Sequence, residues 1–227
     1  MDSDSNIQVK SKERVQKHGE VFTPVWVVKD MLNLLPKDCW KTEITFLEPA
    51  YGEGAFLIEI YKRKLQSIKI KLQDEWEWQV AIATSSIYGI ELLEDNTNLC
   101  KQYLMRVFKT FYNKHFPDTQ DEDYTKTIEF IVNRNIIQGN ALTYRKCKLN
   151  CGNECKTCDP IIFSEWTPFE KCQFRRKDYT YEYIINADKN RQKYADTLFE
   201  VEFSKEELGL IKEYKPVNFK EIRYATD

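Results

Sequence analysis

Four of the seven glycines in this chain stand where a bound ligand would need them: Gly52, Gly54, Gly89 and Gly139. A residue used this sparingly is expected where a side chain is not tolerated, at positive φ or beside a ligand. The stretch 46–57 reads FLEPAYGEGAFL, which predicts a buried strand, a tight glycine turn and the first turn of a helix. Because a helix N-terminus has free backbone N–H groups, the pattern predicts a ligand bound against this turn.

Polar side chains follow the next two predicted strands. Glu91 ends the apolar stretch 86–91, where a carboxylate can accept hydrogen bonds from both hydroxyls of a ribose. Asn140 comes just after the third predicted strand and could hydrogen-bond an adenine edge. In a doubly wound sheet, ligands bind beyond the carboxyl ends of the strands. We therefore expect the glycine turn, Glu91 and Asn140 to form one nucleotide-binding site.

At these positions the chain resembles the amino-methylating DNA adenine methyltransferases of restriction–modification systems, in the arrangement where the cofactor motifs precede the catalytic one. Segment 18–24, HGEVFTP, resembles the N-terminal motif of that family, and 46–57 resembles its cofactor turn. The resemblance covers about residues 15–142. It implies a class I methyltransferase fold and S-adenosylmethionine as the cofactor.

The resemblance also implies positions for individual residues. Glu48 would lie near the cofactor's amino group, Glu91 at the ribose and Asn140 at the adenine ring. The family usually has Asp at the last position, so Asn140 keeps the acceptor oxygen and loses the charge. A different nucleotide is the alternative, although the dinucleotide fingerprint has a third glycine where this chain has Leu57. The implied cofactor residues are Phe22, Thr23, Glu48, Pro49, Ala50, Gly52, Gly54, Phe56, Glu91, Asn140 and Ala141.

The catalytic motif of the resembling family is not found. That family methylates a flipped adenine and carries Asn or Asp, two prolines and Tyr or Phe at the end of strand four. This sequence contains no such tetrapeptide, and Ser164, Glu165 and Trp166 occupy the corresponding place. Glu165 could accept a hydrogen bond from an amine and Trp166 could stack on a base. The alternative is that Trp166 is a core residue and Glu165 is solvated.

The leading functional hypothesis is an adenine-N6 DNA methyltransferase, or the cofactor-binding portion of one. A catalytically inactive cofactor-binding subunit that needs or modulates a partner enzyme is the second hypothesis, and an RNA or protein methyltransferase is the third. DNA is the expected partner, and basic clusters at 171–177 and 189–193 could contact phosphates. Since few residues follow Phe169, a protein partner could supply target recognition or catalysis.

Four of the seven cysteines lie within one short segment: Cys147, Cys151, Cys155 and Cys158. Four thiolates match the ligand number of a closed tetrahedral zinc site, and Cys172 could replace one of them. Reduced free thiols are the alternative. The last three of these cysteines also have the spacing of the iron–sulfur motif in radical S-adenosylmethionine enzymes, which we interpret as a coincidence.

Strands and helices alternate through the middle of the chain, which predicts an α/β fold with a Rossmann-like, largely parallel, doubly wound sheet. Strands are expected at 44–47, 86–91, within 128–138 and at 160–163, and helices at 24–35, 54–72 and 95–111. A polar surface excursion is expected at 113–127, and further strands at 179–185 and 198–203. The predicted organisation is a mobile N-terminal arm (1–20), a methyltransferase-like domain (21–203) with a cysteine-rich knuckle (147–158), and a charged, partly helical C-terminal segment (204–227).

Bulk composition is compatible with this organisation. The chain has 227 residues, 42% of them hydrophobic, and a net charge of −2, which neither favours nor excludes a nucleic-acid partner. No apolar run of about 18 residues suggests a membrane span, and the polar N-terminus lacks the apolar core of a signal peptide. These features predict a cytoplasmic protein with reduced cysteines.

Overall fold

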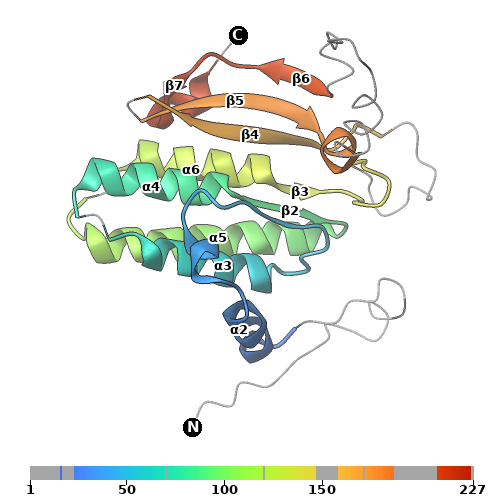
Figure 1. Ribbon diagram of the computed structural model, residues 1–227, viewed down its shortest axis with the longest axis horizontal. Coiled ribbons are helices and arrows are strands. Elements are labelled where there is room, and N and C mark those ends of the chain that lie inside the picture. Colours follow the sequence, from blue (N-terminus) through green and yellow to red (C-terminus); the bar gives the residue numbers. More distant parts are fainter. Residues whose placement is uncertain are drawn as a thin grey trace, which may run out of the picture.

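The computed structural model describes Gln16 and residues 23–69, 71–119, 121–146, 158–170, 172–186 and 209–225. Figure 1 shows the arrangement of the elements in this part of the chain. They are α2 (Val25–Asn33), η1 (Lys37–Trp40), β1 (Phe46–Glu48), α3 (Ala55–Ser67), α4 (Gln73–Ser85), β2 (Ile87–Glu91), α5 (Glu94–His115), α6 (Glu122–Asn135), β3 (Ile136–Gln138), β4 (Ile162–Phe169), β5 (Gln173–Thr180), β6 (Leu210–Glu213), β7 (Val217–Asn218) and η2 (Phe219–Tyr224).

A parallel sheet with the strand order β1-β2-β3 forms the centre of the fold. Its strands are short apolar runs, as expected for a parallel sheet that is covered on both faces. Glu48 is paired with Gly89, and Glu91 with Gln138, so the carboxyl ends of all three strands lie at one edge. The three strands predicted from the first half of the sequence are therefore confirmed, although the third is confined to the end of its predicted range.

Helices cover both faces of this sheet: α3 and α5 lie on one side, and α4 and α6 on the other (Figure 1). The long helix α5 buries Cys100, Leu104 and Phe108 at helical spacing. Two helices differ from the sequence prediction. α4 has no predicted counterpart, because most of its circumference is buried and its sequence lacks an amphipathic pattern. α6 begins inside the predicted surface excursion, where the Asp121 side chain accepts a hydrogen bond from the Tyr124 backbone N–H and caps the helix.

The predicted fourth strand of the parallel sheet is wrong. β4 pairs antiparallel with β5 instead, in a second sheet that also contains β6 and β7. This sheet packs on the outer side of α4 and α6 (Figure 1). The apolar run 160–163 suggested a doubly covered strand, but β4 continues to Phe169 with buried and exposed residues alternating from Ser164 to Glu165 to Trp166. Such alternation is typical of an antiparallel strand with one solvated face.

The end of the described chain belongs to the same packed structure. Residues 210–218 add β6 and β7 to the second sheet, and η2 buries Phe219 and Ile222 in the main core. In the described part of the predicted partly helical segment 204–227 the helix is η2, and the predicted strand at 179–185 ends at Thr180, with 181–186 helical. The predicted strand at 198–203 lies outside the described residues, as does the predicted arm apart from Gln16.

The predicted α/β class is confirmed, with three parallel strands between two helical layers. The predicted cysteine-rich insertion lies outside the described residues except for Cys158. Within the part of the chain that the structure describes, no helix is both long enough and apolar enough to span a bilayer.

Candidate functional site

The glycine turn connects the carboxyl end of β1 to the N-terminus of α3. Gly52 and Gly54 have φ values of 56° and 87°, a left-handed conformation that strains any residue with a side chain. Gly54 is also the N-cap of α3, and a Cβ placed on it would overlap the Cys100 sulfur on α5. The sequence prediction of a glycine-dependent turn against a helix N-terminus is therefore confirmed. Within the turn, the Gly54 N–H donates to the Tyr51 carbonyl at 2.8 Å.

Glu91 ties this turn to the end of β2. Its Oε2 accepts a hydrogen bond from the Gly52 backbone N–H at 2.9 Å, and its Oε1 accepts one from the Leu93 N–H, also at 2.9 Å. The side chain is only 9% exposed, so these bonds fix the direction of the carboxylate. A carboxylate fixed at this edge is the kind of acceptor that a ribose hydroxyl needs.

Glu48 is the second carboxylate at the same edge. Burial and the nearby negative charge of Glu91 raise the pKa of Glu48 to about 7. Its buried Oε2 receives no hydrogen bond from the described residues. A buried carboxylate without a donor is costly, and a cationic ligand group beside it would restore the charged form. The amino group of S-adenosylmethionine is such a group, so Glu48 fits the cofactor that the resemblance implies.

Tyr51 is a component of the turn that the sequence prediction missed. Its ring is buried, and its hydroxyl donates a hydrogen bond to Thr97 Oγ1 on α5 at 3.2 Å. The ring lies over Gly89, where an added Cβ would come within 2.5 Å of it. The glycine in the middle of β2 was the available signal, since a glycine inside a strand often marks the close approach of another group.

Asn140 follows β3 at the same edge but uses its side chain locally. Its Oδ1 accepts hydrogen bonds from the backbone N–H groups of Leu142 and Thr143, at 2.9 and 3.3 Å. The acceptor oxygen predicted for an adenine edge therefore closes the turn after β3. Leu142, in that turn, is 89% exposed.

The other predicted cofactor residues surround this cluster or lie away from it. Thr23 precedes α2 and is partly buried, and Pro49 and Ala50 are exposed in the turn after β1. Phe56 and Ala141 are partly buried against the two apolar clusters of the core. Phe22 lies outside the described residues. The structure thus brings Glu48, the glycine turn and Glu91 into one cluster and places the end of β3 beside it.

The three candidate catalytic residues lie on β4, in the second sheet. Ser164 is fully buried and donates a hydrogen bond to Asp178 Oδ1 at 2.7 Å, and Trp166 is buried and donates from Nε1 to Asn135 Oδ1 at 2.9 Å. Glu165 points to the opposite, exposed face of the strand. The sequence prediction placed them at a fourth strand of the parallel sheet, but β4 pairs antiparallel with β5 in the second sheet. Their observed contacts are structural ones.

The predicted cysteine cluster and the predicted basic cluster were the remaining candidate features. Cys147, Cys151 and Cys155 lie outside the described residues, whereas Cys158 is partly buried. The described residues contain no group of metal-ligating side chains, so zinc stays a prediction. The basic cluster at 171–177 is not one continuous basic surface. Arg176 is only 5% exposed, lies 3.4 Å from Asp178 Oδ1 and stacks on the Tyr214 ring.

Comparisons with known proteins agree with the geometry of this site. The family described as the MmeI DNA-methyltransferase domain matches residues 28–186. The Type II methyltransferase M.VspI of Vibrio sp. (strain 343) is 36% identical over 77 residues, which cover 34% of this chain and 18% of the relative. The match thus spans less than a fifth of that relative's length. No solved structure matches the chain significantly. Because the family match covers well over half of the chain, this protein belongs to the MmeI DNA-methyltransferase domain family.

Proposed function

We propose that this chain binds S-adenosylmethionine and is the cofactor-binding part of a DNA methyltransferase of the adenine-N6 type. The observation that carries the proposal is the joint placement of the glycine turn, Glu48 and Glu91 at the carboxyl edge of the parallel sheet. Membership in the MmeI DNA-methyltransferase domain family supports the same assignment.

Each residue of the cluster has a distinct proposed role. Glu48 binds the cofactor's amino group, because its buried oxygen needs a donor and its charge needs a cation. Glu91, whose carboxylate is held at the end of β2 by the Gly52 and Leu93 N–H groups, accepts hydrogen bonds from the ribose hydroxyls. The turn itself, without side chains at positions 52 and 54, lets the ligand approach the backbone closely. When bound, the cofactor supplies an electrophilic methyl group.

The protein's contribution to methyl transfer is positioning. Transfer would form a bond between the adenine nitrogen and the methyl carbon, break the sulfonium S–C bond and release an amine proton, and it would be favoured by holding the two atoms in line and by acceptors on the amine. The adenine-N6 type rests on the resemblance of segments 18–24 and 46–57 to the motifs of the adenine methyltransferases.

A second candidate function is a cofactor-binding subunit that completes a partner enzyme. One observation favours it: Ser164 and Trp166, at the place of the missing catalytic motif, are buried and bonded to Asp178 and Asn135. Neither side chain is available to an adenine amine. In this alternative, the amine acceptor comes from a partner polypeptide, and the present chain supplies the bound cofactor.

Calorimetric titration with S-adenosylmethionine tests the proposal. We expect Glu91→Ala to lower the affinity roughly 100-fold, since a carboxylate with charge-assisted hydrogen bonds to two hydroxyls is removed. Glu91→Gln keeps the shape and one acceptor oxygen, and we expect an intermediate loss. Glu75→Ala, which removes an exposed carboxylate from α4, is the matched control.

Equal affinities of wild type and Glu91→Ala would contradict the ribose assignment. If wild type binds, transfer of a labelled methyl group to unmethylated DNA separates the two candidates. Transfer by the chain alone supports the methyltransferase, whereas transfer that requires an added partner supports the subunit.

A further inference from the structure

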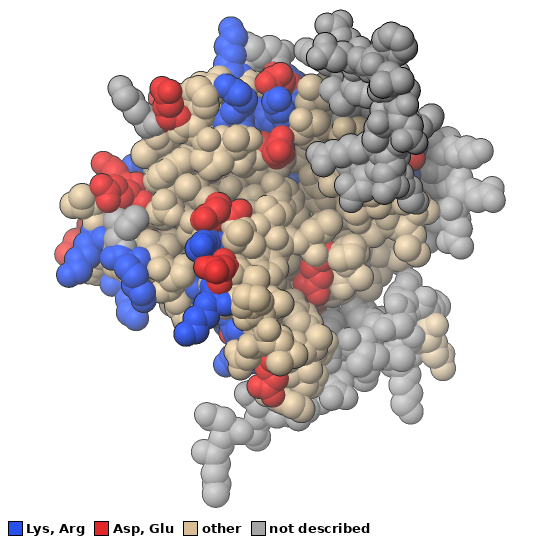
Figure 2. Space-filling view, in the orientation of Figure 1, with Lys and Arg blue, Asp and Glu red and all other residues tan. Residues whose placement is uncertain are grey.

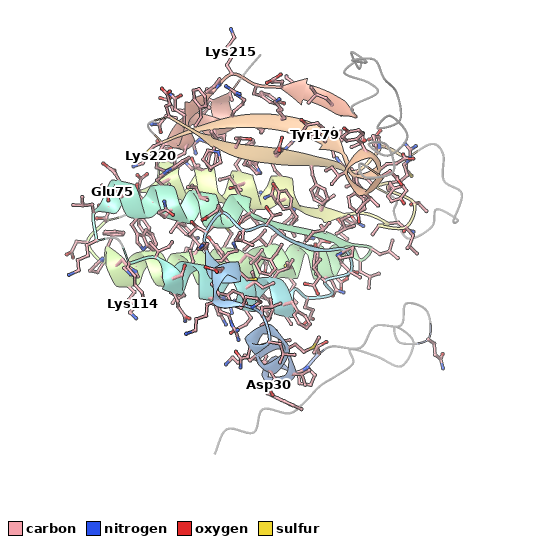
Figure 3. The ribbon with its side chains drawn as sticks, viewed as in Figure 1. Asp30, Glu75, Lys114, Tyr179, Lys215 and Lys220 are labelled. Carbon is pink, nitrogen blue, oxygen red and sulfur yellow. The ribbon has the colours of Figure 1, made fainter. Side chains whose placement is uncertain are left out.

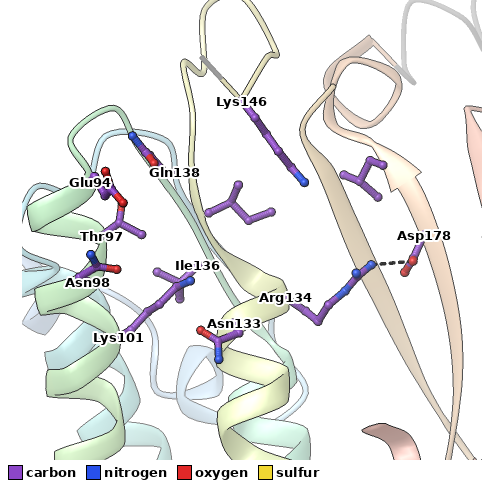
Figure 4. Close-up of a pocket in the computed structure, with 12 residues that line it drawn as sticks. Glu94, Thr97, Asn98, Lys101, Asn133, Arg134, Ile136, Gln138, Lys146 and Asp178 are labelled. Carbon is purple, nitrogen blue, oxygen red and sulfur yellow. Dashed lines mark hydrogen bonds and ion pairs between the residues drawn. The ribbon is translucent and has the colours of Figure 1, made fainter. Parts of the chain in front are cut away.

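A cavity of about 500 Å³ lies at the β3 edge of the parallel sheet. Its walls come from α5, α6, β3 and the start of the β4–β5 hairpin (Figure 4). Glu48, Gly52, Gly54 and Glu91 do not line it. Gln138, at the carboxyl end of β3, does, so the cavity opens beside the edge where the proposed cofactor site lies. Its volume is in the range of small-ligand sites.

Three basic side chains from three different elements line this cavity. Lys101 comes from α5, Arg134 from α6 and Lys146 from the segment after β3, and Figure 4 shows them around the same hollow. The described residues form no ion pair with Lys101 or Lys146. Both ammonium groups are therefore available to an anion.

The two carboxylates of the cavity do not cancel this charge. Asp178 lies 2.6 Å from Arg134 Nη2 and 3.4 Å from Arg176 Nε, so two guanidinium groups share one carboxylate. Its oxygens also accept hydrogen bonds from Ser164 and Tyr214. Glu94 is exposed at the start of α5. The net charge of the cavity lining is therefore positive, because Lys101 and Lys146 outnumber Glu94.

In the ligand-free protein, the positive charge of Lys101 is in an unfavourable environment. Burial lowers the pKa of Lys101, since its ammonium group loses solvation without gaining a carboxylate partner. An anion in the cavity would reverse that loss. The side-chain amides of Asn98 and Asn133 line the same hollow and add neutral hydrogen-bond donors. A cavity with unpaired ammonium groups and amide donors is suited to phosphate oxygens.

We propose that this cavity binds phosphate groups, either phosphodiester groups of DNA or the phosphate of a free nucleotide, through Lys101 and Lys146. The DNA source rests on the proposed function, whereas the nucleotide source does not. If the ligand is DNA, the cavity would hold the sugar–phosphate backbone of the DNA beside the carboxyl edge of the parallel sheet. Such contacts position a duplex but carry no sequence information themselves.

Binding of the full chain to a short duplex, measured by fluorescence anisotropy over a range of salt concentrations, tests the DNA source. Each lost phosphate contact reduces the slope of log K against log salt by about 0.9. We therefore expect a reduction of about 0.9 for Lys101→Gln, about the same for Lys146→Gln, and about twice that for the double variant. Lys146 is exposed, so its variant keeps the test valid if Lys101→Gln folds poorly. Calorimetry with AMP and with inorganic phosphate tests the nucleotide source.

Lys114→Gln is the matched control, because Lys114 is exposed on the same helix α5, about 20 Å further along its axis (Figure 3). If the slope of log K against log salt becomes less steep in the cavity variants and not in Lys114→Gln, the DNA source is supported. AMP binding that is lost in the cavity variants, with an unchanged DNA slope, supports the nucleotide source. Equal effects of all three lysines, or no binding of DNA, AMP or phosphate, would overturn the proposal. Titration with S-adenosylmethionine reports separately on the proposed function and should be unchanged in the cavity variants.

Discussion

Glu48 and Glu91 illustrate how two carboxylates at one edge of a sheet acquire different properties. Glu91 accepts hydrogen bonds from two backbone N–H groups, whereas the buried Oε2 of Glu48 accepts none from the described residues. Burial and the charge of Glu91 then raise the pKa of Glu48 to about 7. The difference allows one group to bind hydroxyls as a fixed acceptor and the other to respond to a cation.

We expect cofactor affinity to depend on the ionisation of Glu48. The ionised carboxylate is needed for an ammonium group, so affinity should rise roughly eightfold between pH 6 and pH 7.5, a window below the ordinary pKa of an α-amino group. Calorimetric titration at several pH values measures this rise. Glu48→Gln should bind more weakly at pH 7.5 and lose the rise, and a variant with the same pH profile as wild type would contradict the assignment.

Ionisation of Glu48, which should raise cofactor affinity, should lower the stability of the ligand-free protein. The pKa of Glu48 is higher in the folded protein than its ordinary value of 4.5, so the stability that Glu48 contributes to the ligand-free protein is lost as pH rises from about 4.5 to about 7. Glu48→Gln should therefore raise the melting temperature of the ligand-free protein at pH 8 by a few degrees while weakening cofactor binding. A lower melting temperature would show that Glu48 stabilises the turn.

Among the elements, α3 carries a buried lysine that stabilises the segment preceding β1. The Lys64 side chain is fully buried, and its ammonium group donates hydrogen bonds to the backbone carbonyls of Lys41, Thr42 and Ile44 at 2.9, 3.1 and 2.6 Å. Burial lowers the pKa of Lys64 to about 8. The segment before β1 therefore depends on one side chain from the helix that follows the strand.

We expect Lys64→Met to lower the free energy of unfolding by about 1–3 kcal/mol at pH 7, because it leaves these carbonyls without their donor. Urea denaturation measures the effect. Lys62→Met, two positions earlier on the same helix at a partly exposed site, is the control and should change stability by less than about 0.5 kcal/mol. Equal losses in the two variants would contradict the role of the three hydrogen bonds.

Across the whole molecule, the second sheet and the end of the described chain are joined to the methyltransferase-like core. Tyr88 on β2 donates a hydrogen bond to the Ser164 carbonyl at 2.8 Å, and Lys220 lies 2.6 Å from the fully buried carboxylate of Glu77 on α4. Phe219 contacts the rings of Trp78 and Tyr124. These contacts span distant parts of the sequence, so we expect the described residues to unfold together.

Phe219→Ala tests this cooperativity. Removing a buried ring from the core should lower the free energy of unfolding by about 3–5 kcal/mol. Far-ultraviolet circular dichroism and tryptophan fluorescence should still report one coincident transition in urea. Tyr224→Ala removes an exposed ring from the same 3-10 helix and serves as the control. Separate transitions for the two probes would show that the C-terminal segment is only loosely joined to the core.

The surface over α2 exposes several apolar side chains. On the face shown in Figure 2, much of the surface over α2 is uncharged. Val25, Trp26, Met31 and Leu34 are all more than half exposed, whereas Val28 and Leu32 are buried. The predicted helix at 24–35 is confirmed as α2, but its apolar residues are divided between the core and the surface.

Local features of the sequence determined which residues lie at the carboxyl edge of the parallel sheet. The glycine turn, the short apolar strands and the position of Glu91 could be predicted because each depends on a few neighbouring residues and on elementary backbone preferences. The helix α4 and the start of α6 could not, because buried helices lack an amphipathic period and a polar first turn resembles a loop.

The tertiary structure decided the rest through long-range contacts. Whether β4 joins the parallel sheet or pairs with β5 depends on partners elsewhere in the chain, and that choice gives Ser164 and Trp166 their buried hydrogen bonds. The raised pKa of Glu48 and the cavity around Lys101 likewise arise from groups that only folding brings together. The sequence thus determined which residues stand at the strand ends, and packing decided their burial, charge state and neighbours, because those depend on surroundings that no local pattern encodes.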